Sequence, residues 1–369
     1  NFHYSRGAFD GIYGHGSSVK PNDYDGDGDV DVFMGAAVMP MLYGMSPMSY
    51  MLVNDGAGRF SSDADWVGAS QFDNPTRVRP GMVKDAVWAD INSDKLVDLV
   101  LVGEWMPVTI MMQLPNHQFR NITREMGLHD KRGWWNGVAA HDFDADGDID
   151  LVAGNLGWNS RLKATKDKPL QMYLGDFDSN GGSDHILVYY NGDQRFPFAS
   201  RDALVKQLPA LKKKFLNYRD YRNVRLEDIV TPAQKGNSAL MTVDDFSSLY
   251  LENKGNSFAP TALPLEAQLF PIFGIAVDDV DNDAIPDLLI TGNLSATQPD
   301  LGPYDCGLGL VLKGNGHGGF SALAPSRSGF VVQGEGRGIA VTRNAQGEKV
   351  YLVARNNDTI EAFKTQNHE

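Results

Sequence analysis

The residues of this chain whose types and spacing could do chemistry are closely spaced carboxylates. In the segment DYDGDGDVD, Asp23, Asp25, Asp27 and Asp31 occupy the first, third, fifth and ninth positions, and Asp29 occupies the seventh. Carboxylates a few Å apart repel one another and raise each other's pKa unless a cation lies between them. Ca²⁺ suits such a loop, because it accepts about six to eight oxygen ligands in a flexible shell. Gly26 and Gly28 would let so tight a loop turn without clashes of Cβ atoms.

The same spacing recurs four more times along the chain. The further sets are Asp90, Asn92, Asp94 and Asp98; Asp142, Asp144, Asp146 and Asp150; Asp176, Asp178, Asn180 and Asp184; and Asp279, Asp281, Asp283 and Asp287. We number these loops one to five in chain order. A single loop of this kind could be a solvated acidic turn, but five with the same spacing predict up to five calcium sites.

The segments around the loops are typical of β-strands. After each loop comes a short run of β-branched and apolar residues: VDVFMG, VDLVLVG, IDLVAG, HILVYY and PDLLITG. An EF-hand would instead need a helix on each side and a glutamate at the twelfth position. That position is Met34 in loop one, so the EF-hand is excluded.

The composition limits the class of partner and the cellular setting. The formal charge is 33 − 47 = −14, which five Ca²⁺ ions would reduce to about −4. An acidic chain disfavours nucleic acid as a partner, and no apolar run is long enough for membrane insertion. Loops that bind calcium weakly belong to extracellular modules, so we expect an extracellular, cell-surface or periplasmic protein. Because the chain starts at Asn1 without a signal peptide, we expect a fragment of a longer chain, with neighbouring domains as possible partners.

The strands and loops form a repeating unit of strand, acidic loop, strand, strand, turn and strand. Four-stranded propeller blades run about 40–50 residues, and a ring of blades leaves few open sheet edges. Residues 248–258, SLYLENKGNSF, resemble the back half of a blade whose loop has decayed, and residues 336–363 resemble a whole blade whose loop has lost its acids. We therefore predict an all-β fold, with residues 1–369 forming a single β-propeller of about seven blades, six being the alternative.

One segment departs from this pattern. Residues 200–228 place Leu204, Leu208, Leu211, Phe215 and Tyr218 at helical spacing, and either Ser200 or Asp202 could cap a helix there. We predict a helical insert packed on one face of the propeller. It is also the basic part of the chain, with cations at Lys212, Lys213, Lys214, Arg219, Arg222 and Arg225. Its lysines and arginines are either simply solvated or form a docking surface for an acidic partner.

The acidic loop between two strands resembles the FG-GAP/VCBS repeat of integrin α-subunit propellers. The resemblance implies that the first, third, fifth and ninth positions supply side-chain ligands to calcium and that the seventh supplies a backbone carbonyl. Loops two and five depart from the family at Lys95 and Ala284, where glycine is usual, and loop four has Asn180 at its fifth position. These departures weaken the expectation for loops two and five most.

A broader resemblance covers most of the chain. GWWNGVAAHDFDADGDIDLVAGNLGWNSR, FASRDALVKQLPALKKKFLNY, SLYLENKGNSF and ARNND resemble large bacterial surface proteins that carry FG-GAP repeats beside an ASPIC/UnbV domain and are related to cartilage acidic protein. No ASPIC/UnbV segment is seen here, which fits a fragment. The resemblance implies a fold and a calcium requirement more than a particular ligand.

Several common catalytic motifs are absent from this sequence. No GxSxG, HExxH, P-loop or CxxC pattern occurs, so we expect no enzyme. The first hypothesis is a binding module for a protein or glycan, with structural calcium. The alternatives are a polysaccharide-active, lyase-like enzyme on a calcium-containing propeller and a purely architectural domain of a larger surface protein. Trp105, Trp134, Trp135 and Trp158 lie near blade ends and could either fill the core or stack on sugars.

Overall fold

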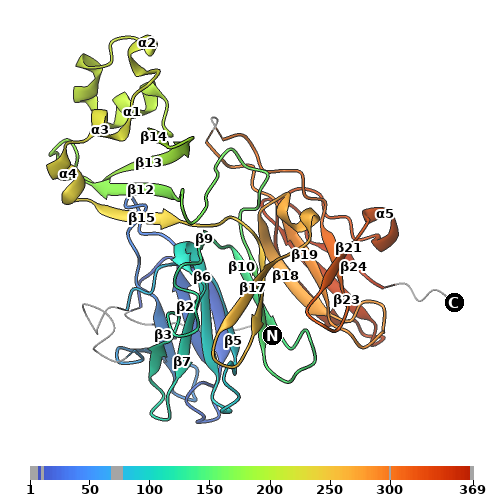
Figure 1. Ribbon diagram of the computed structural model, residues 1–369. Helices are drawn as coiled ribbons and strands as arrows, with labels where there is room; N and C mark the ends of the chain where they lie inside the picture. The colour runs from blue at the N-terminus through green and yellow to red at the C-terminus, as the bar shows by residue number, and fades with distance from the viewer. Residues whose placement is uncertain (1–6, 10–11, 68–77, 299–300, 366–369) are drawn as a thin grey trace.

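The computed structural model describes residues 7–9, 12–67, 78–298 and 301–365, and most of its regular structure is antiparallel β-sheet (Figure 1). The described residues form six sheets, so the expected all-β class is confirmed. Apolar residues on alternate or successive strand positions form buried clusters within and between these sheets. The six sheets fall into a body and an insert.

Two sheets come from the first part of the chain. The first contains β1 (Gly16–Asn22), β2 (Asp31–Ala36), β3 (Tyr50–Asn54) and β4 (Phe60–Asp63) in that order. The second contains β5 (Met82–Ala89), β6 (Asp98–Pro107), β7 (Thr109–Gln113) and β8 (Phe119–Asn121), and β9 (Arg132–Trp134) pairs with the far half of β6. Loop one joins β1 to β2 and loop two joins β5 to β6, as the repeating unit predicts.

Three more sheets complete the body. The third contains β10 (Gly137–His141), β11 (Asp150–Gly154), β16 (Leu249–Asn253) and β17 (Phe258–Ala262). The next contains β18 (Ile272–Asp278), β19 (Asp287–Gly292), β20 (Leu310–Gly314) and β21 (Phe320–Leu323), with the 3₁₀ turn η2 (Leu265–Gln268) before it and α5 (Pro325–Ser328) after it. The last contains β22 (Gly336–Arg343), β23 (Lys349–Arg355) and β24 (Glu361–Phe363).

The first strands of successive body sheets lie side by side. β1 lies against β5, β5 against β10, β10 against β18, and β18 against β22. Among the described residues, five sheets follow one another in this way. The propeller of about seven blades, or six, stays a prediction.

The interpretation of residues 248–258 as a separate decayed blade is wrong. β16 pairs with β11, with Leu251 opposite Leu151, so these residues complete the sheet of loop three. The chain between β11 and β16 is therefore an insertion within that sheet. The long interval between loops four and five contains the rest of this insertion instead of an extra blade.

The insertion carries the sixth sheet and the helices, which stand above the body in Figure 1. Its strands are β14 (Gln194–Pro197), β13 (Asp184–Asn191), β12 (Leu170–Gly175) and β15 (Ala239–Val243), in that spatial order, and loop four joins β12 to β13. Its helices are α1 (Arg201–Gln207), η1 (Pro209–Lys213), α2 (Tyr218–Tyr221), α3 (Leu226–Ile229) and α4 (Pro232–Gly236).

The expected helical segment is confirmed, with two differences. Ser200 caps α1 by accepting a hydrogen bond from the Ala203 backbone N–H, and Leu204 and Leu208 pack against the sheet. Pro209 has no N–H to continue α1, so the segment divides into short turns instead of one helix. Tyr218, expected on the apolar face, is 68% exposed.

The insert packs on the body through Met172 of β12. This side chain is 1% exposed and belongs to a cluster that includes Met82 and Trp105 of the second sheet. Removing such a side chain leaves a cavity that the surroundings fill only in part. We expect Met172→Ala to lower the free energy of unfolding by about 2–5 kcal/mol in chemical denaturation.

Leu240→Ala is the matched control. Leu240 lies on the neighbouring strand β15 and is 51% exposed, so its truncation should cost much less. Equal losses for the two variants would show that the insert does not pack on the body as described.

Candidate metal sites

The five acidic loops share one backbone conformation. The fourth and sixth positions have positive φ in every loop: Gly26 (75°), Ser93 (59°), Ala145 (61°), Ser179 (61°) and Asn282 (62°) at the fourth, and Gly28 (94°), Lys95 (72°), Gly147 (96°), Gly181 (82°) and Ala284 (66°) at the sixth. Lys95 and Ala284, where the family has glycine, thus adopt the same left-handed conformation. A side chain costs about 1–2 kcal/mol in this conformation. Loops two to five carry such a cost at the fourth position, and loops two and five carry a second one at the sixth.

The first-position carboxylate closes each loop onto its own backbone. Its Oδ2 accepts the sixth-position N–H, with N···O distances of 3.1 Å at Asp23, 2.8 Å at Asp90, 3.1 Å at Asp142, 2.9 Å at Asp176 and 2.9 Å at Asp279. One oxygen of each first-position carboxylate is thereby fixed by the loop itself.

The ninth-position aspartate anchors each loop to its sheet. Asp31, Asp98, Asp150 and Asp287 are 0% exposed and Asp184 is 8% exposed. In every loop its Oδ2 accepts the second-position backbone N–H, at 2.9–3.3 Å. In loops one, two, three and five its Oδ1 also accepts an N–H from the end of the third strand, from Asn54, Gln113, Asn253 and Gly314 respectively.

Loop four differs because its third strand, β14, pairs only with the far half of β13, from Val188 to Asn191, and does not reach Asp184. Gln207 of α1 takes that place and donates to Asp184 Oδ1 at 3.4 Å. Gln234 of α4 donates to the carbonyl of Phe177 at 2.7 Å. The helices of the insert therefore position loop four.

Each body loop is also bound by the next sheet along the chain. Gln113 Nε2 donates to the carbonyl of Tyr24 in loop one at 2.6 Å, and Asn253 Nδ2 donates to the carbonyl of Ile91 in loop two at 2.8 Å. In loop three, the backbone N–H of Gly318 donates to the carbonyl of Phe143. In loop five, the ammonium of Lys349 donates to the carbonyl of Asp279 at 3.1 Å. The loops therefore hold neighbouring sheets together.

The structure brings most of the predicted ligands together. Carboxylate oxygens lie within 4.8 Å of one another in four groups: Asp23, Asp25 and Asp27; Asp142, Asp144 and Asp146; Asp176, Asp178 and Asp184; and Asp279, Asp281 and Asp287. No group of three forms in loop two among the described residues, where Asn92 donates to Asp94 instead. The Asp29 carboxylate is not part of the group of loop one. It lies instead against the backbone of Gly56, where an added Cβ would be 2.5 Å from its Oδ2.

The electrostatics of loop three fit a cation. Burial, together with the charges of Asp150 and Asp146, raises the pKa of Asp144 to about 6. Asp142 Oδ1 is buried and has no hydrogen-bond partner among the described residues. An orphaned buried carboxylate oxygen is costly, and a hard cation bound by Asp142, Asp144, Asp146 and Asp150 would satisfy it and offset their repulsion.

Sequence reasoning missed Lys313, whose ammonium reaches the carboxylates of loop five from the third strand. Its ammonium pairs with Asp281 and also lies 3.1 Å from Asp283 Oδ2. Lys313 is on β20, 26 residues after loop five ends at Asp287, so only the pairing of β19 with β20 brings it there. A search for charged residues at this place of the third strand would have found it.

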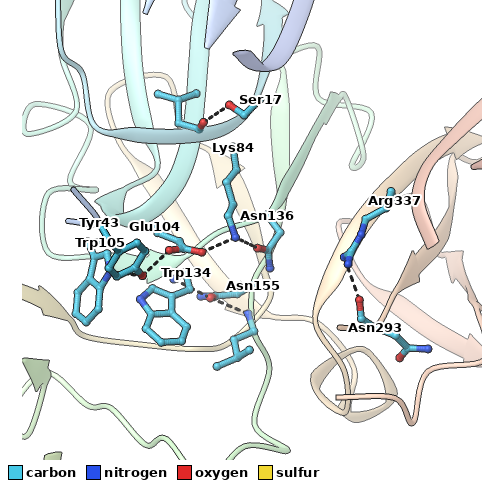
Figure 2. Close-up of polar contacts among 12 residues, drawn as sticks. Ser17, Tyr43, Lys84, Glu104, Trp105, Trp134, Asn136, Asn155, Asn293 and Arg337 are labelled. Carbon is cyan, nitrogen blue, oxygen red and sulfur yellow. Dashed lines mark hydrogen bonds and ion pairs between the residues drawn. The ribbon is translucent and has the colours of Figure 1, made fainter. Parts of the chain in front are cut away.

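A second polar cluster, also unexpected from sequence, lies among the first strands of the body (Figure 2). Glu104 pairs with Lys84 and accepts a hydrogen bond from Tyr43 Oη at 2.6 Å, and Lys84 reaches Asn136 at 3.0 Å. Arg337 stacks on the Phe273 ring, with its Cζ 4.1 Å from the ring centroid. The cluster joins the second and third sheets through charged hydrogen bonds.

The tryptophans divide between the two expected roles. Trp135 is fully buried, Trp105 is 6% exposed, and Trp134 packs edge-on against Trp105 and Phe246. These three fill the core. Trp158 is 44% exposed and is the one of the four that could stack on a sugar.

Comparison with known proteins supports the repeat. Residues 90–153, from loop two through loop three, match the family described as FG-GAP-like repeat. The matched segment covers two of the five acidic loops and the strands between them. A comparison with curated proteins found no match.

Two of the solved structures that match this chain show a remote likeness to it. The V. cholerae biofilm matrix protein Bap1 is 9% identical with a TM-score of 0.32, covering 95% of this chain and 77% of that one. BBS1N in complex with ARL6DN is 10% identical with a TM-score of 0.25, covering 97% of this chain and 95% of that one. At such scores neither likeness supports a conclusion about fold or function.

Asn253 tests the coupling between loops and sheets. It is fully buried, its N–H binds Asp150 and its amide binds the carbonyls of Ile91 and Ile149. Asn253→Ala leaves two buried carbonyls without this donor, so we expect a loss of about 2–3 kcal/mol of stability in chemical denaturation.

Asn256→Ala, in the exposed turn that follows, should change stability by less than about 0.5 kcal/mol. If Asn253→Ala were as mild as this control, the contact between the second and third sheets would not depend on loop two.

Proposed function

We propose that this chain is a calcium-binding β-propeller of the FG-GAP type that serves as an extracellular binding module. The observation that carries the proposal is the buried, unpartnered Asp142 Oδ1 within a converging group of carboxylates. The shared backbone of the five loops supports the same ligand arrangement elsewhere. When bound, Ca²⁺ supplies positive charge and coordination to these oxygens.

Calcium has a structural role in this proposal. In loops one, three and five, the carboxylates converge and a backbone carbonyl is bound by the next sheet. A cation in a loop fixes the position of those carbonyls and so the contact between sheets. Catalytic use of the same carboxylates is not needed.

The partner is a protein or glycan, and the insert offers the surface for it. Lys206, Lys212, Lys213, Arg219 and Arg222 are exposed, and the described residues show no ion pair for them. Leu216 and Tyr218, both 68% exposed, lie beside them. A cationic surface with apolar residues on an otherwise acidic chain suits an acidic partner, including a neighbouring domain of the same protein.

The location of the module outside the cell is part of the proposal. Weak calcium loops match the calcium levels of extracellular space. None of the described helices has the length and apolarity of a membrane span.

No observation favours the lyase-like alternative. Such an enzyme would need a free Lys, Tyr or His base near an arginine. Lys84 and Tyr43 lie close together, but both bind Glu104, and burial raises the pKa of Tyr43 well above its usual value. Absence of enzymatic activity stays a prediction.

Removing calcium tests the proposal. A site filled at ten times its Kd adds about 1.4 kcal/mol, so four or five sites add roughly 6–7 kcal/mol. For a chain of this length that corresponds to a fall in Tm of roughly 10 °C in EDTA, measured by calorimetry beside the metal content of the purified protein.

The control is Mg²⁺, which prefers a smaller octahedral site and should restore much less of the lost stability than Ca²⁺. Little bound calcium together with an unchanged Tm in EDTA would overturn the calcium proposal and leave the loops as acidic turns.

A further inference from the structure

One position on the third strand lies beside the acidic loop in four sheets. The ninth-position carboxylate binds the N–H of Asn54, Gln113, Asn253 or Gly314, which fixes the register between loop and strand. The residue just before each of these therefore occupies an equivalent place. These residues are Val53, Met112, Glu252 and Lys313.

Contacts in two of the sheets show that this place faces the third-position ligand. Lys313 pairs with Asp281, the third position of loop five. Glu252 interacts with Asp144, the third position of loop three. Glu252 also forms an ion pair with Lys254. The same place is apolar beside loops one and two.

Lys313 changes the charge balance of loop five. The four ligand candidates of this loop carry four negative charges, and the ammonium lowers the net charge to −4 + 1 = −3. In loops one and three the fifth-position aspartate joins the first and third, whereas in loop five Asp283 stands outside the group and contacts Lys313 at 3.1 Å. A calcium ion at loop five must displace this ammonium from two carboxylates.

We propose that Lys313 is the resident cation of loop five. Loop five keeps its conformation without calcium and binds calcium more weakly than loops one and three do. The residue at this third-strand place thus sets the calcium dependence of its loop, with Lys313 and Glu252 acting in opposite directions. The part of the inference that concerns calcium affinity rests on the proposed function.

Lys313→Met tests the inference, with Lys212→Met as the control that removes the same charge from the exposed insert. In EDTA, Lys313→Met should lower Tm relative to the wild type, because four carboxylates lose their counter-charge, and Lys212→Met should not. In a calcium titration followed by calorimetry, Lys313→Met should bind one more Ca²⁺ or bind its weakest Ca²⁺ about tenfold more tightly. Adding Asp279→Asn to Lys313→Met should abolish this gain, which assigns it to loop five.

Glu252→Gln provides the opposite change. It should weaken calcium binding at loop three in the same titration, whereas Lys313→Met strengthens binding at loop five.

The outcomes separate the two proposals. If the wild type binds calcium but Lys313→Met alters neither the titration nor Tm in EDTA, the inference is wrong and the calcium module stands. If no variant binds calcium, the proposed function is wrong, and a lower Tm of Lys313→Met alone would still identify Lys313 as the resident cation.

Discussion

The fold depends on five buried aspartates, the ninth residues of the acidic loops. A carboxylate removed from water is costly unless hydrogen bonds and opposite charge compensate it. Here two backbone N–H groups, one from the loop and one from the third strand, bind each of the four carboxylates in the body. Their burial still raises the pKa of Asp98 to about 6, so hydrogen bonds alone do not offset the cost of the charge.

The charge that hydrogen bonds leave uncompensated in each loop bears on how neighbouring sheets are held together. Under the proposed function a cation meets the remaining charge of each group, and the body loops present carbonyls to hydrogen-bond donors of the next sheet. The turn that gathers carboxylates is therefore also the contact between sheets. At the other end of β5 and β6 from loop two, the cluster of Lys84, Glu104 and Asn136 connects neighbouring sheets with charges that are already paired within the protein.

The parts of this structure that could be predicted from sequence are local. The spacing of the carboxylates and the turn glycines of loops one and three fall within nine residues, and the flanking strands follow directly. Strand pairing across long separations could not be read in the same way. The pairing of β11 with β16 spans the whole insert, and nothing in SLYLENKGNSF distinguishes the end of an interrupted sheet from that of a decayed one.

The same limit explains why the five loops looked more alike than they are. Their ligands follow one spacing, but the neighbours that tune them come from the third strand, and in loop four from α1 and α4. In loop two, Asn92 donates to Asp94. A lysine from the third strand pairs with loop five, and a further carboxylate from the third strand lies beside loop three. If the proposed calcium role holds, such a repeat combines loops that need calcium with one that carries its own cation, and part of the connection between sheets then persists when calcium is low.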